Sequence, residues 1–152
     1  MGDYQILGHN DREQWLKELE RLTFPVPDLH CRPEYLGLFG ETGAAKLFIY
    51  REGRAAVYYP YLLRDVGAIP GVTGAMGRGW RDITSPYGYG GPLAAGDTGA
   101  AVWRNFYRCF TAYCRREKII TEFVRFHPLL KNHLALVELM PVEKASAVVF
   151  VD

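Results

Sequence analysis

One stretch of sequence decides the fold: Lys46–Arg51 (KLFIYR), Glu52-Gly53 and Arg54–Leu63 (RAAVYYPYLL). The two longer segments are rich in aromatic and aliphatic residues, and Glu52-Gly53 suits a tight turn because glycine tolerates a positive φ. This pattern predicts a β-hairpin. In its second strand, alternate apolar residues share one face, namely Val57, Tyr59, Tyr61 and Leu63. Pro60 cannot donate to a sheet ladder and therefore predicts an edge or a bulge.

Helices are predicted on both sides of this hairpin. A helix over 11–22 places Trp15, Leu16, Leu19 and Leu22 on one face, and Asn10 with Glu13 fits a capping pattern. Pro33 suits the first turn of a short helix that runs through Phe39. A longer helix extends from an expected N-cap at Asp97 to about Arg116. Its apolar face comprises Val102, Trp103, Phe106, Tyr107, Phe110, Tyr113 and Cys114.

The remaining segments predict a mixed sheet. Strands are expected over 80–85, 119–126 and 147–151, and a short helix over 128–133. Helices mixed with a largely antiparallel sheet give an α/β (α+β) fold, with one domain over residues 1–152.

Composition excludes several classes of protein. Hydrophobic residues make up 49% and charged residues 23% of the 152, which excludes intrinsic disorder. A net charge of +1 is too near neutral to predict nucleic-acid binding. No apolar run approaches the roughly 18 residues of a membrane span, and the N-terminal residues do not resemble a secretory signal. With three cysteines and no C-x-x-C spacing, we expect a reduced, cytoplasmic protein.

The nucleophilic and metal-binding side chains form no recognisable motif. Ser85 and Ser146 lie in no G-x-S-x-G sequence, and Cys31 follows His30 without that adjacency aiming one side chain at the other. None of the four histidines has the spacing of a metal ligand pair: His9, His30, His127 and His133. The sequence therefore predicts no metal site and identifies no catalytic residue.

The loop Tyr87-Gly88-Tyr89-Gly90-Gly91-Pro92 is the first candidate binding element. Its glycines allow the backbone to approach a ligand closely, and its two tyrosines suit a stacking wall or a hydrogen-bonding rim. Binding of an anion is less favoured, since Pro92 lacks an N–H and the carboxylate of Asp97 would repel a phosphate. The alternative is a long turn packed by its own aromatic rings.

Arg125 and His127 are the second candidate, at the end of the strand predicted over 119–126. Strand ends beside a glycine-rich loop are where layered folds commonly hold ligands. Arg125 suits a carboxylate or phosphate, and His127 suits hydrogen bonding or proton transfer. Alternatively, Arg125 pairs with a core carboxylate such as Asp82 or Glu122.

Four segments together resemble the N-terminal lobe of the FemAB-like proteins, within the GNAT acyltransferase superfamily. They are Arg32–Leu36 (RPEYL), Leu47–Gly53 (LFIYREG), Asp82–Pro92 (DITSPYGYGGP) and Glu122–Leu129 (EFVRFHPL). The resemblance is scattered over most of residues 30–150, and the third and fourth segments are its specific part.

The resemblance implies an activity and a partner. Fem-type enzymes carry two GNAT-like lobes and transfer an amino acid from aminoacyl-tRNA to the peptide of a peptidoglycan precursor, while relatives use acyl-CoA donors. This chain has about the length of one lobe, and Val148–Asp152 fall where family members would cross into the second. We therefore expect a truncated chain or a single-lobe relative. The GNAT acyl-CoA signature R/Q-x-x-G-x-G/A has no match at Tyr87–Pro92, which argues against acyl-CoA binding by this lobe.

The expected function is acceptor binding in an N-acyl- or aminoacyltransferase of the cell wall, with little or no activity of the isolated lobe. Substrate binding is expected from Tyr87, Gly88, Tyr89, Gly90, Gly91, Arg125 and His127. The lobe would need no cofactor of its own, and its partner would be a second GNAT-like lobe or another copy of the chain. The alternatives are a non-catalytic GNAT-like interaction module and a complete small acyl-CoA N-acetyltransferase.

Overall fold

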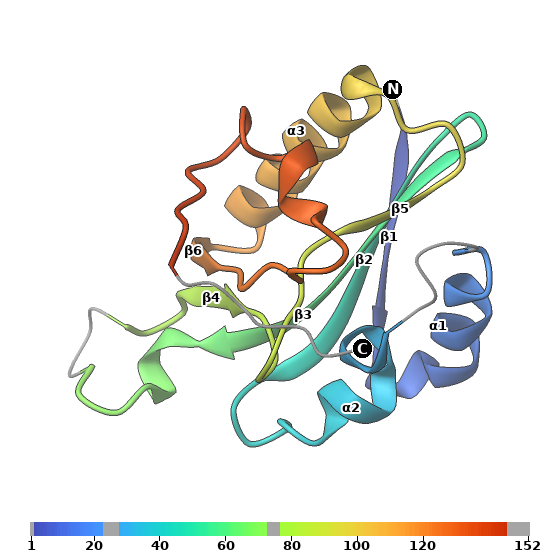
Figure 1. The fold of residues 1–152 in the computed structure, drawn as a ribbon. Helices are drawn as coiled ribbons and strands as arrows, with labels where there is room; N and C mark the ends of the chain where they lie inside the picture. The colour runs from blue at the N-terminus through green and yellow to red at the C-terminus, as the bar shows by residue number, and fades with distance from the viewer. Residues whose placement is uncertain (1, 23–27, 73–76, 146–152) are drawn as a thin grey trace.

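The chain forms an α+β fold, and its described residues build a mixed, mostly antiparallel sheet of six strands flanked by three α-helices (Figure 1). The computed structural model describes residues 2–22, 28–72 and 77–145. Its strands are β1 (Asp3–Gly8), β2 (Ala44–Glu52), β3 (Ala55–Asp65), β4 (Arg81–Thr84), β5 (Leu93–Ala95) and β6 (Ile119–Phe123). Its α-helices are α1 (Arg12–Leu19), α2 (Pro33–Gly37) and α3 (Ala100–Arg116). The fold class expected from the sequence is confirmed.

The predicted hairpin is the centre of the sheet. Strands β2 and β3 pair antiparallel from Ala44↔Leu63 to Glu52↔Ala55, and Gly53 occupies the turn with φ +59°. The apolar residues of β3 alternate as predicted: one face carries Val57, Tyr59 and Tyr61, and the other Ala56, Tyr58 and Leu62. Both faces are buried, because helices cover both sides of the sheet.

The sheet forks along β3. The order is β1-β2-β3-β4-β6, and β5 pairs with β3 beside residues 56–58, whereas β4 pairs beside residues 62–65. Pro60 lies between these two stretches, so its missing N–H falls where β3 has a strand partner on one side only. The fork matters for the site because the chain from β4 to β5 must turn beside the ends of β4 and β6.

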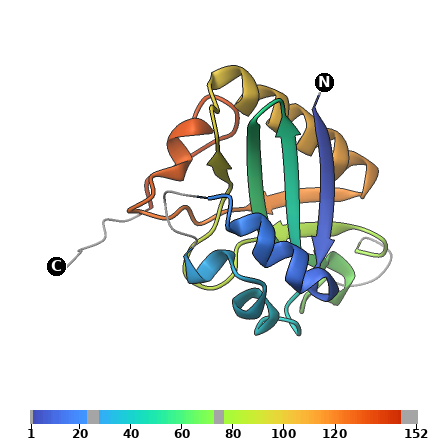
Figure 2. The same cartoon turned by 90° about the vertical axis from the view of Figure 1, so that its right-hand side faces the viewer.

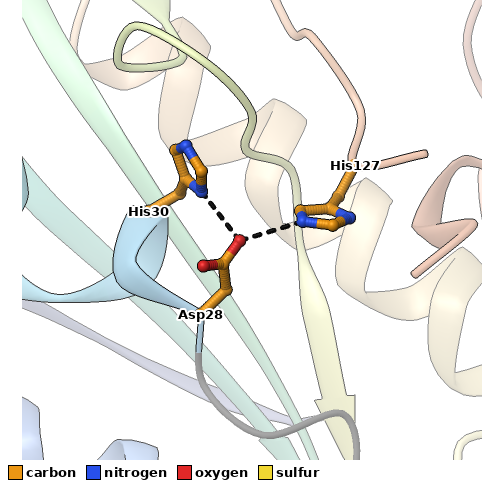
Figure 3. A group of neighbouring side chains, drawn as sticks. All are labelled: Asp28, His30 and His127. Carbon is orange, nitrogen blue, oxygen red and sulfur yellow. Dashed lines mark hydrogen bonds and ion pairs between the residues drawn. The ribbon is translucent and has the colours of Figure 1, made fainter. Parts of the chain in front are cut away.

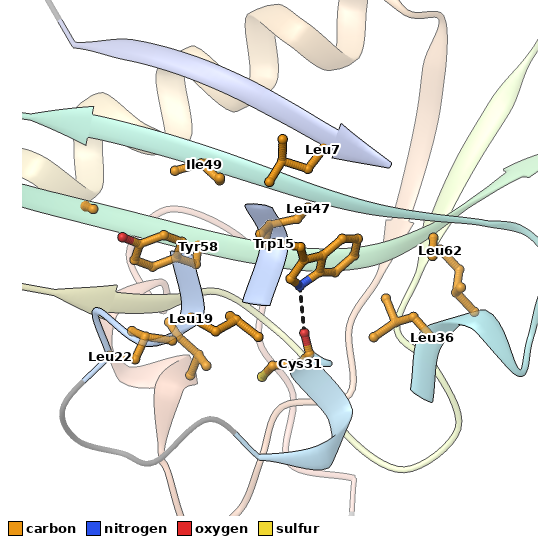
Figure 4. Close-up of a cluster of buried hydrophobic side chains, with 13 residues drawn as sticks. Leu7, Trp15, Leu19, Leu22, Cys31, Leu36, Leu47, Ile49, Tyr58 and Leu62 are labelled. Atoms are coloured by element: carbon orange, nitrogen blue, oxygen red, sulfur yellow. Dashed lines mark hydrogen bonds between the residues drawn. The ribbon is translucent and has the colours of Figure 1, made fainter. Parts of the chain in front are cut away.

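Helices α1 and α2 cover one face of the sheet and α3 covers the other (Figure 2). Trp15 of α1 is fully buried and donates its Nε1–H to the carbonyl of Cys31, 2.9 Å away (Figure 4). The buried residues between the sheet and helices α1 and α2 form the first core. This bond ties the segment before α2 to that core. An indole N–H buried without an acceptor would cost about 1–3 kcal/mol, so the bond also fixes the path of residues 29–31.

The predicted apolar face of α3 is also confirmed. All seven of its residues lie in or against the second core, which is the buried cluster between α3 and the sheet. Arg104, Arg108 and Arg115 on the opposite face are exposed. At the end of the helix, the hydroxyl groups of Tyr61 and Tyr113 form a buried hydrogen bond of 2.9 Å. Within the described residues, no helix has the length and apolar character needed to cross a membrane.

Both predicted helix caps are wrong. The first helix begins at Arg12 after a 3₁₀ turn (His9–Asp11), so Asp11 rather than Asn10 is its N-cap, and the Asp11 carboxylate accepts from the N–H of Gly8 at 2.7 Å. The third begins at Ala100 with Gly99 as N-cap instead of Asp97, because β5 and a turn at Gly96 (φ +79°) delay its start.

Strand predictions missed two elements and overextended one. No prediction covered β1, a half-buried strand beside β2, or the three-residue β5. The last described strand, β6, ends at Phe123 rather than residue 126, because the chain after it pairs with the β4–β5 connection instead of with β4. A 3₁₀ helix over Asn132–Ala135 replaces the helix expected over 128–133, and the strand expected over 147–151 lies outside the described residues.

Candidate functional site

The loop Tyr87–Pro92, here called the glycine–tyrosine loop, lies beside the carboxyl ends of the parallel strands β4 and β6. Gly90 donates its N–H to the carbonyl of Arg125 at 2.8 Å and forms a β-bridge with Phe126. The N–H of Arg125 donates to the hydroxyl of Ser85, also at 2.8 Å. The structure therefore brings together the two candidate elements found in the sequence.

Asn132 fastens the glycine–tyrosine loop to the segment after β6. Its Nδ2 donates to the carbonyl of Gly90 at 2.9 Å, and its Oδ1 accepts from the N–H of His127 at 3.1 Å. A side chain at Gly91 would place its Cβ only 2.8 Å from this Nδ2, so glycine is needed for the approach. Nothing in the sequence singles out Asn132, since its partner Gly90 lies 42 positions away.

The central feature of the site is a histidine–aspartate cluster of Asp28, His30 and His127 (Figure 3). Oδ2 of Asp28 lies 2.7 Å from Nδ1 of His30 and 2.9 Å from Nε2 of His127. All three side chains are partly buried, with 28%, 18% and 15% of their surface exposed, respectively. The sequence predicted only His127, because the cluster joins segments that are about a hundred residues apart.

The hydrogen bonds around the cluster assign a proton to one nitrogen of each ring. Nδ1 of His127 faces the backbone N–H groups of Leu129 (3.2 Å) and Leu130 (3.4 Å), so it accepts, and its Nε2 carries the proton donated to Asp28. His30 points Nδ1 at the same carboxylate and therefore carries its proton there. The two rings thus have opposite tautomers.

The carboxyl group of Asp28 stays ionised in this setting. Partial burial acts to raise its pKa, but the hydrogen bond from His30 and the electrostatic attraction of the two imidazole N–H groups outweigh burial, so the pKa lies below its usual 3.8. A carboxylate at this position stabilises both N–H donors.

Aromatic rings and a glycine surround His30. The rings of Tyr35 and Tyr89 lie edge-on to the imidazole, with centroids 5.1 and 5.6 Å away. Gly88 has φ +89°, and a Cβ built there would lie 2.3 Å from Nε2 of His30. The hydroxyl of Tyr35 donates to the carbonyl of Tyr87 at 2.9 Å, which fixes the loop against α2. The loop is thus held by contacts to His30, Tyr35 and Asn132 rather than by its own rings alone.

Arg125 does not pair with either core carboxylate suggested by the sequence. The carboxylate of Asp82 accepts two hydrogen bonds from Arg64, one from Nε to Oδ1 at 2.8 Å and one from Nη2 to Oδ2. Glu122 accepts from the hydroxyl of Tyr59 at 2.5 Å. Arg125 is exposed, and its side chain has no hydrogen bond or ion pair to any described residue. Its guanidinium remains available to a ligand, as does the side chain of Tyr87, which is 77% exposed.

None of the three cysteines offers a reactive thiolate. Burial raises the pKa of the Cys31 and Cys114 thiols to about 12 and also raises the pKa of Cys109. Cys31 is packed in the first core, and the other two lie against the second. All three thiols thus take part in packing.

The histidine–aspartate cluster is also the one group of described side chains with the composition of a metal site. Its three ligand atoms lie within 4.8 Å of one another. A histidine that binds a metal through Nε2 normally donates Nδ1–H to an acceptor. At His127 that nitrogen faces two N–H donors, so the present hydrogen bonds favour a proton over a metal ion at Nε2.

Two surface hollows lie away from the cluster. One, of about 490 Å³, is lined by residues that include Lys46, Arg64, Arg81 and Arg116, and the other, of about 610 Å³, by residues that include His9 and Lys46. Neither contains a residue that the sequence singled out for substrate binding. Comparisons with models of protein families, with curated proteins and with solved structures find no match to this chain.

Proposed function

We propose that this chain is the acceptor-binding lobe of a FemAB-like N-acyl- or aminoacyltransferase and presents an amine to an activated ester. The resemblance in the sequence carries the family part of this proposal. Three of the four resembling segments contribute to one site: Tyr35 from the first, Tyr87–Gly91 from the third and His127 from the fourth. Segments that resemble a family separately and meet at one place favour a shared binding role.

The observation that carries the choice of an amine is that aromatic rings and a carboxylate both lie next to His30. Tyr35 and Tyr89 stand beside His30, and the carboxylate of Asp28 lies under it. An ammonium group is attracted to aromatic faces and to a carboxylate. The exposed Arg125, at the rim of the same loop, suits a carboxylate of the same acceptor. A peptide with a free side-chain amine and acidic groups matches both features.

Catalysis by the whole protein would come mainly from proximity. Holding an amine against an activated ester converts a bimolecular step into one within a complex, which contributes about 7–11 kcal/mol at best. The proposal places the donor, aminoacyl-tRNA or acyl-CoA, on a second GNAT-like lobe or a second copy of the chain. The isolated lobe would then bind acceptor without turning it over.

A titration with a peptidoglycan stem peptide tests the proposal. The pentapeptide L-Ala–γ-D-Glu–L-Lys–D-Ala–D-Ala is added to ¹⁵N-labelled protein, and the same peptide with an acetylated lysine serves as the control. We expect saturable shifts at Gly88, Gly90 and His127 with the free amine, and weaker binding of the acetylated peptide. Absence of binding by either peptide would reject the acceptor assignment. Saturable micromolar binding of acetyl-CoA in calorimetry would instead favour the complete acetyltransferase.

A second candidate is a non-catalytic interaction module, favoured by the outer edge of the sheet. Among the described residues β6 pairs only with β4, and its Ile120 and Phe123 are 55% and 60% exposed. An uncovered apolar edge strand is a common site of association. Sedimentation at increasing concentration separates the candidates: self-association lost in Phe123→Lys, without peptide binding, would support the module.

A further inference from the structure

We propose that Nε2 of His30 accepts the proton of the acceptor amine, with Asp28 as its positioning residue; this inference rests on the proposed function. An amine held at physiological pH is largely an ammonium ion and cannot attack an ester until it loses a proton. The sequence offered no base for that step. The directions of the hydrogen bonds now single out one nitrogen.

Three of the four ring nitrogens in the histidine–aspartate cluster are occupied by hydrogen bonds. His127 uses both nitrogens, accepting at Nδ1 from Leu129 and Leu130 and donating from Nε2 to Asp28. His30 uses only Nδ1, whose proton goes to the same carboxylate. Nε2 of His30 therefore keeps a lone pair and has no hydrogen-bond partner among the described residues. It is the single ring nitrogen of the cluster that can accept a proton without breaking an existing bond.

Solvent reaches this nitrogen. In the part of the chain that the structure describes, Oε2 of Glu34 is the one side-chain oxygen or nitrogen that is both sealed from solvent and unpartnered. Nε2 of His30 has no partner among the same residues and is therefore not sealed by them. Gly88 lies close to this nitrogen, and a Cβ there would stand 2.3 Å from Nε2, so any side chain at position 88 would cover the lone pair. Glycine at position 88 thus allows the loop to lie close to His30 without a side chain on Nε2.

In the proposed step the acceptor ammonium group loses two protons and gains one acyl group. The acceptor ammonium transfers one proton to Nε2 of His30, and the resulting imidazolium is stabilised through Nδ1–H by the ionised Asp28. The free amine forms a C–N bond to the donor carbonyl carbon, and the C–O bond of the ester, or the C–S bond of a thioester, breaks. The second amine proton passes to the leaving oxygen or sulfur, and His30 returns its proton to solvent.

Reaction with diethyl pyrocarbonate tests the assignment on the unmodified protein. The reagent acylates a ring nitrogen that has a free lone pair, and peptide mass spectrometry measures the rate at each histidine. His30 and His127 make a matched pair, because their side chains are 18% and 15% exposed. We expect His30 to react at least about tenfold faster than His127, since both nitrogens of His127 are occupied. Equal rates, or faster reaction at His127, would overturn the proposal.

A second arm separates this inference from the proposed function. The stem pentapeptide is titrated into wild type and His30→Gln, with His133→Gln as the control. A proton acceptor contributes little to holding the substrate, so we expect both variants to bind within about threefold of wild type, the scale of an ordinary surface change. Binding by wild type that is abolished in His30→Gln would show that His30 holds the acceptor and is not its base. No binding by wild type would reject the proposed function, whatever the reactivity of His30.

Discussion

Asp28 and Glu122 are two partly buried carboxyl groups beside the same sheet, and their pKa values are shifted in opposite directions. Burial acts to raise the pKa of Asp28, but two imidazole N–H groups donate to its carboxylate and hold that pKa below 3.8. Glu122 accepts from the Tyr59 hydroxyl alone, and burial raises its pKa above 4.5. The difference shows that the donors around a carboxyl group, and not its burial alone, set its charge. Of the two, only Asp28 can hold imidazole rings in defined tautomers.

The largest expected effect comes from filling the space beside the cluster. Gly88→Ala combines a positive φ with a Cβ 2.3 Å from His30, and we expect a loss of about 3 kcal/mol in the free energy of unfolding. Gly79→Ala is the matched control, with φ +79° and nothing within 4 Å of its Cβ. Urea denaturation of both variants isolates the collision with His30. Equal losses in the two would mean that the loop does not press on the histidine.

Removing the carboxylate of Asp28 comes next. Asp28→Ala leaves two imidazole N–H donors without their acceptor, and we expect a loss of about 2 kcal/mol at pH 7. Asp97→Ala, at an exposed position, should change stability by less than about 0.5 kcal/mol. The same denaturation experiment measures both. A loss no larger than that of the control would contradict the role given to Asp28.

The stability contributed by Asp28 also has a predictable pH dependence. Because its folded pKa is lowered, the contribution is complete above the unfolded value near 3.8 and is lost as pH falls through the lower folded value. Wild type should therefore exceed Asp28→Ala in stability from pH 7 to 5, and the gap should narrow below about pH 4. A gap that stays constant into strong acid would exclude a charged Asp28.

The contribution of Glu122 to stability should depend on pH with the opposite sign to that of Asp28. Its raised folded pKa means that the ionised carboxylate costs stability, a cost that is absent below the unfolded value of 4.5 and grows as pH rises through the folded value. Glu122→Gln keeps an acceptor for Tyr59 and should stabilise the protein by about 1 kcal/mol at pH 7. The gain should vanish in acid, and Glu20→Gln, at the exposed C-cap of the first helix, should show none. A loss of stability in Glu122→Gln at pH 7 would contradict the opposite effects expected for Glu122 and Asp28.

The smallest effect on stability is expected at Arg125. Its side chain contacts no described partner, so Arg125→Ala should change the free energy of unfolding by less than about 0.5 kcal/mol. It should still weaken stem-peptide binding if it meets an acidic group of the acceptor. Unchanged peptide affinity would remove Arg125 from the site and leave only its backbone in a structural role.

How much of the fold could be predicted from the sequence depended on periodicity. The hairpin and the long third helix follow from alternation and from helical spacing, which are local patterns. The first strand, Asp3–Gly8, was missed because it is short and mostly half-buried, and β5 was missed because three residues carry no period. The helix caps were wrong because turns of three or four residues displaced the starts of the helices.

The candidate site was predicted only where composition marks it. Glycine and tyrosine made the loop visible, and a strand end pointed to Arg125 and His127. Asp28, His30 and Asn132 carried no such signal, because their partners lie far away along the chain. Which nitrogen of each ring holds the proton depends on contacts with the backbone of Leu129 and Leu130, which only the folded chain provides.

The central claim is that the two histidines of the cluster carry their protons on different nitrogens. A long-range ¹H–¹⁵N spectrum of the imidazole rings at neutral pH tests it directly, with His30→Gln and His127→Gln used to assign the signals. We expect a proton on Nδ1 of His30 and on Nε2 of His127. A proton on Nε2 of His30, or on Nδ1 of His127, would contradict it.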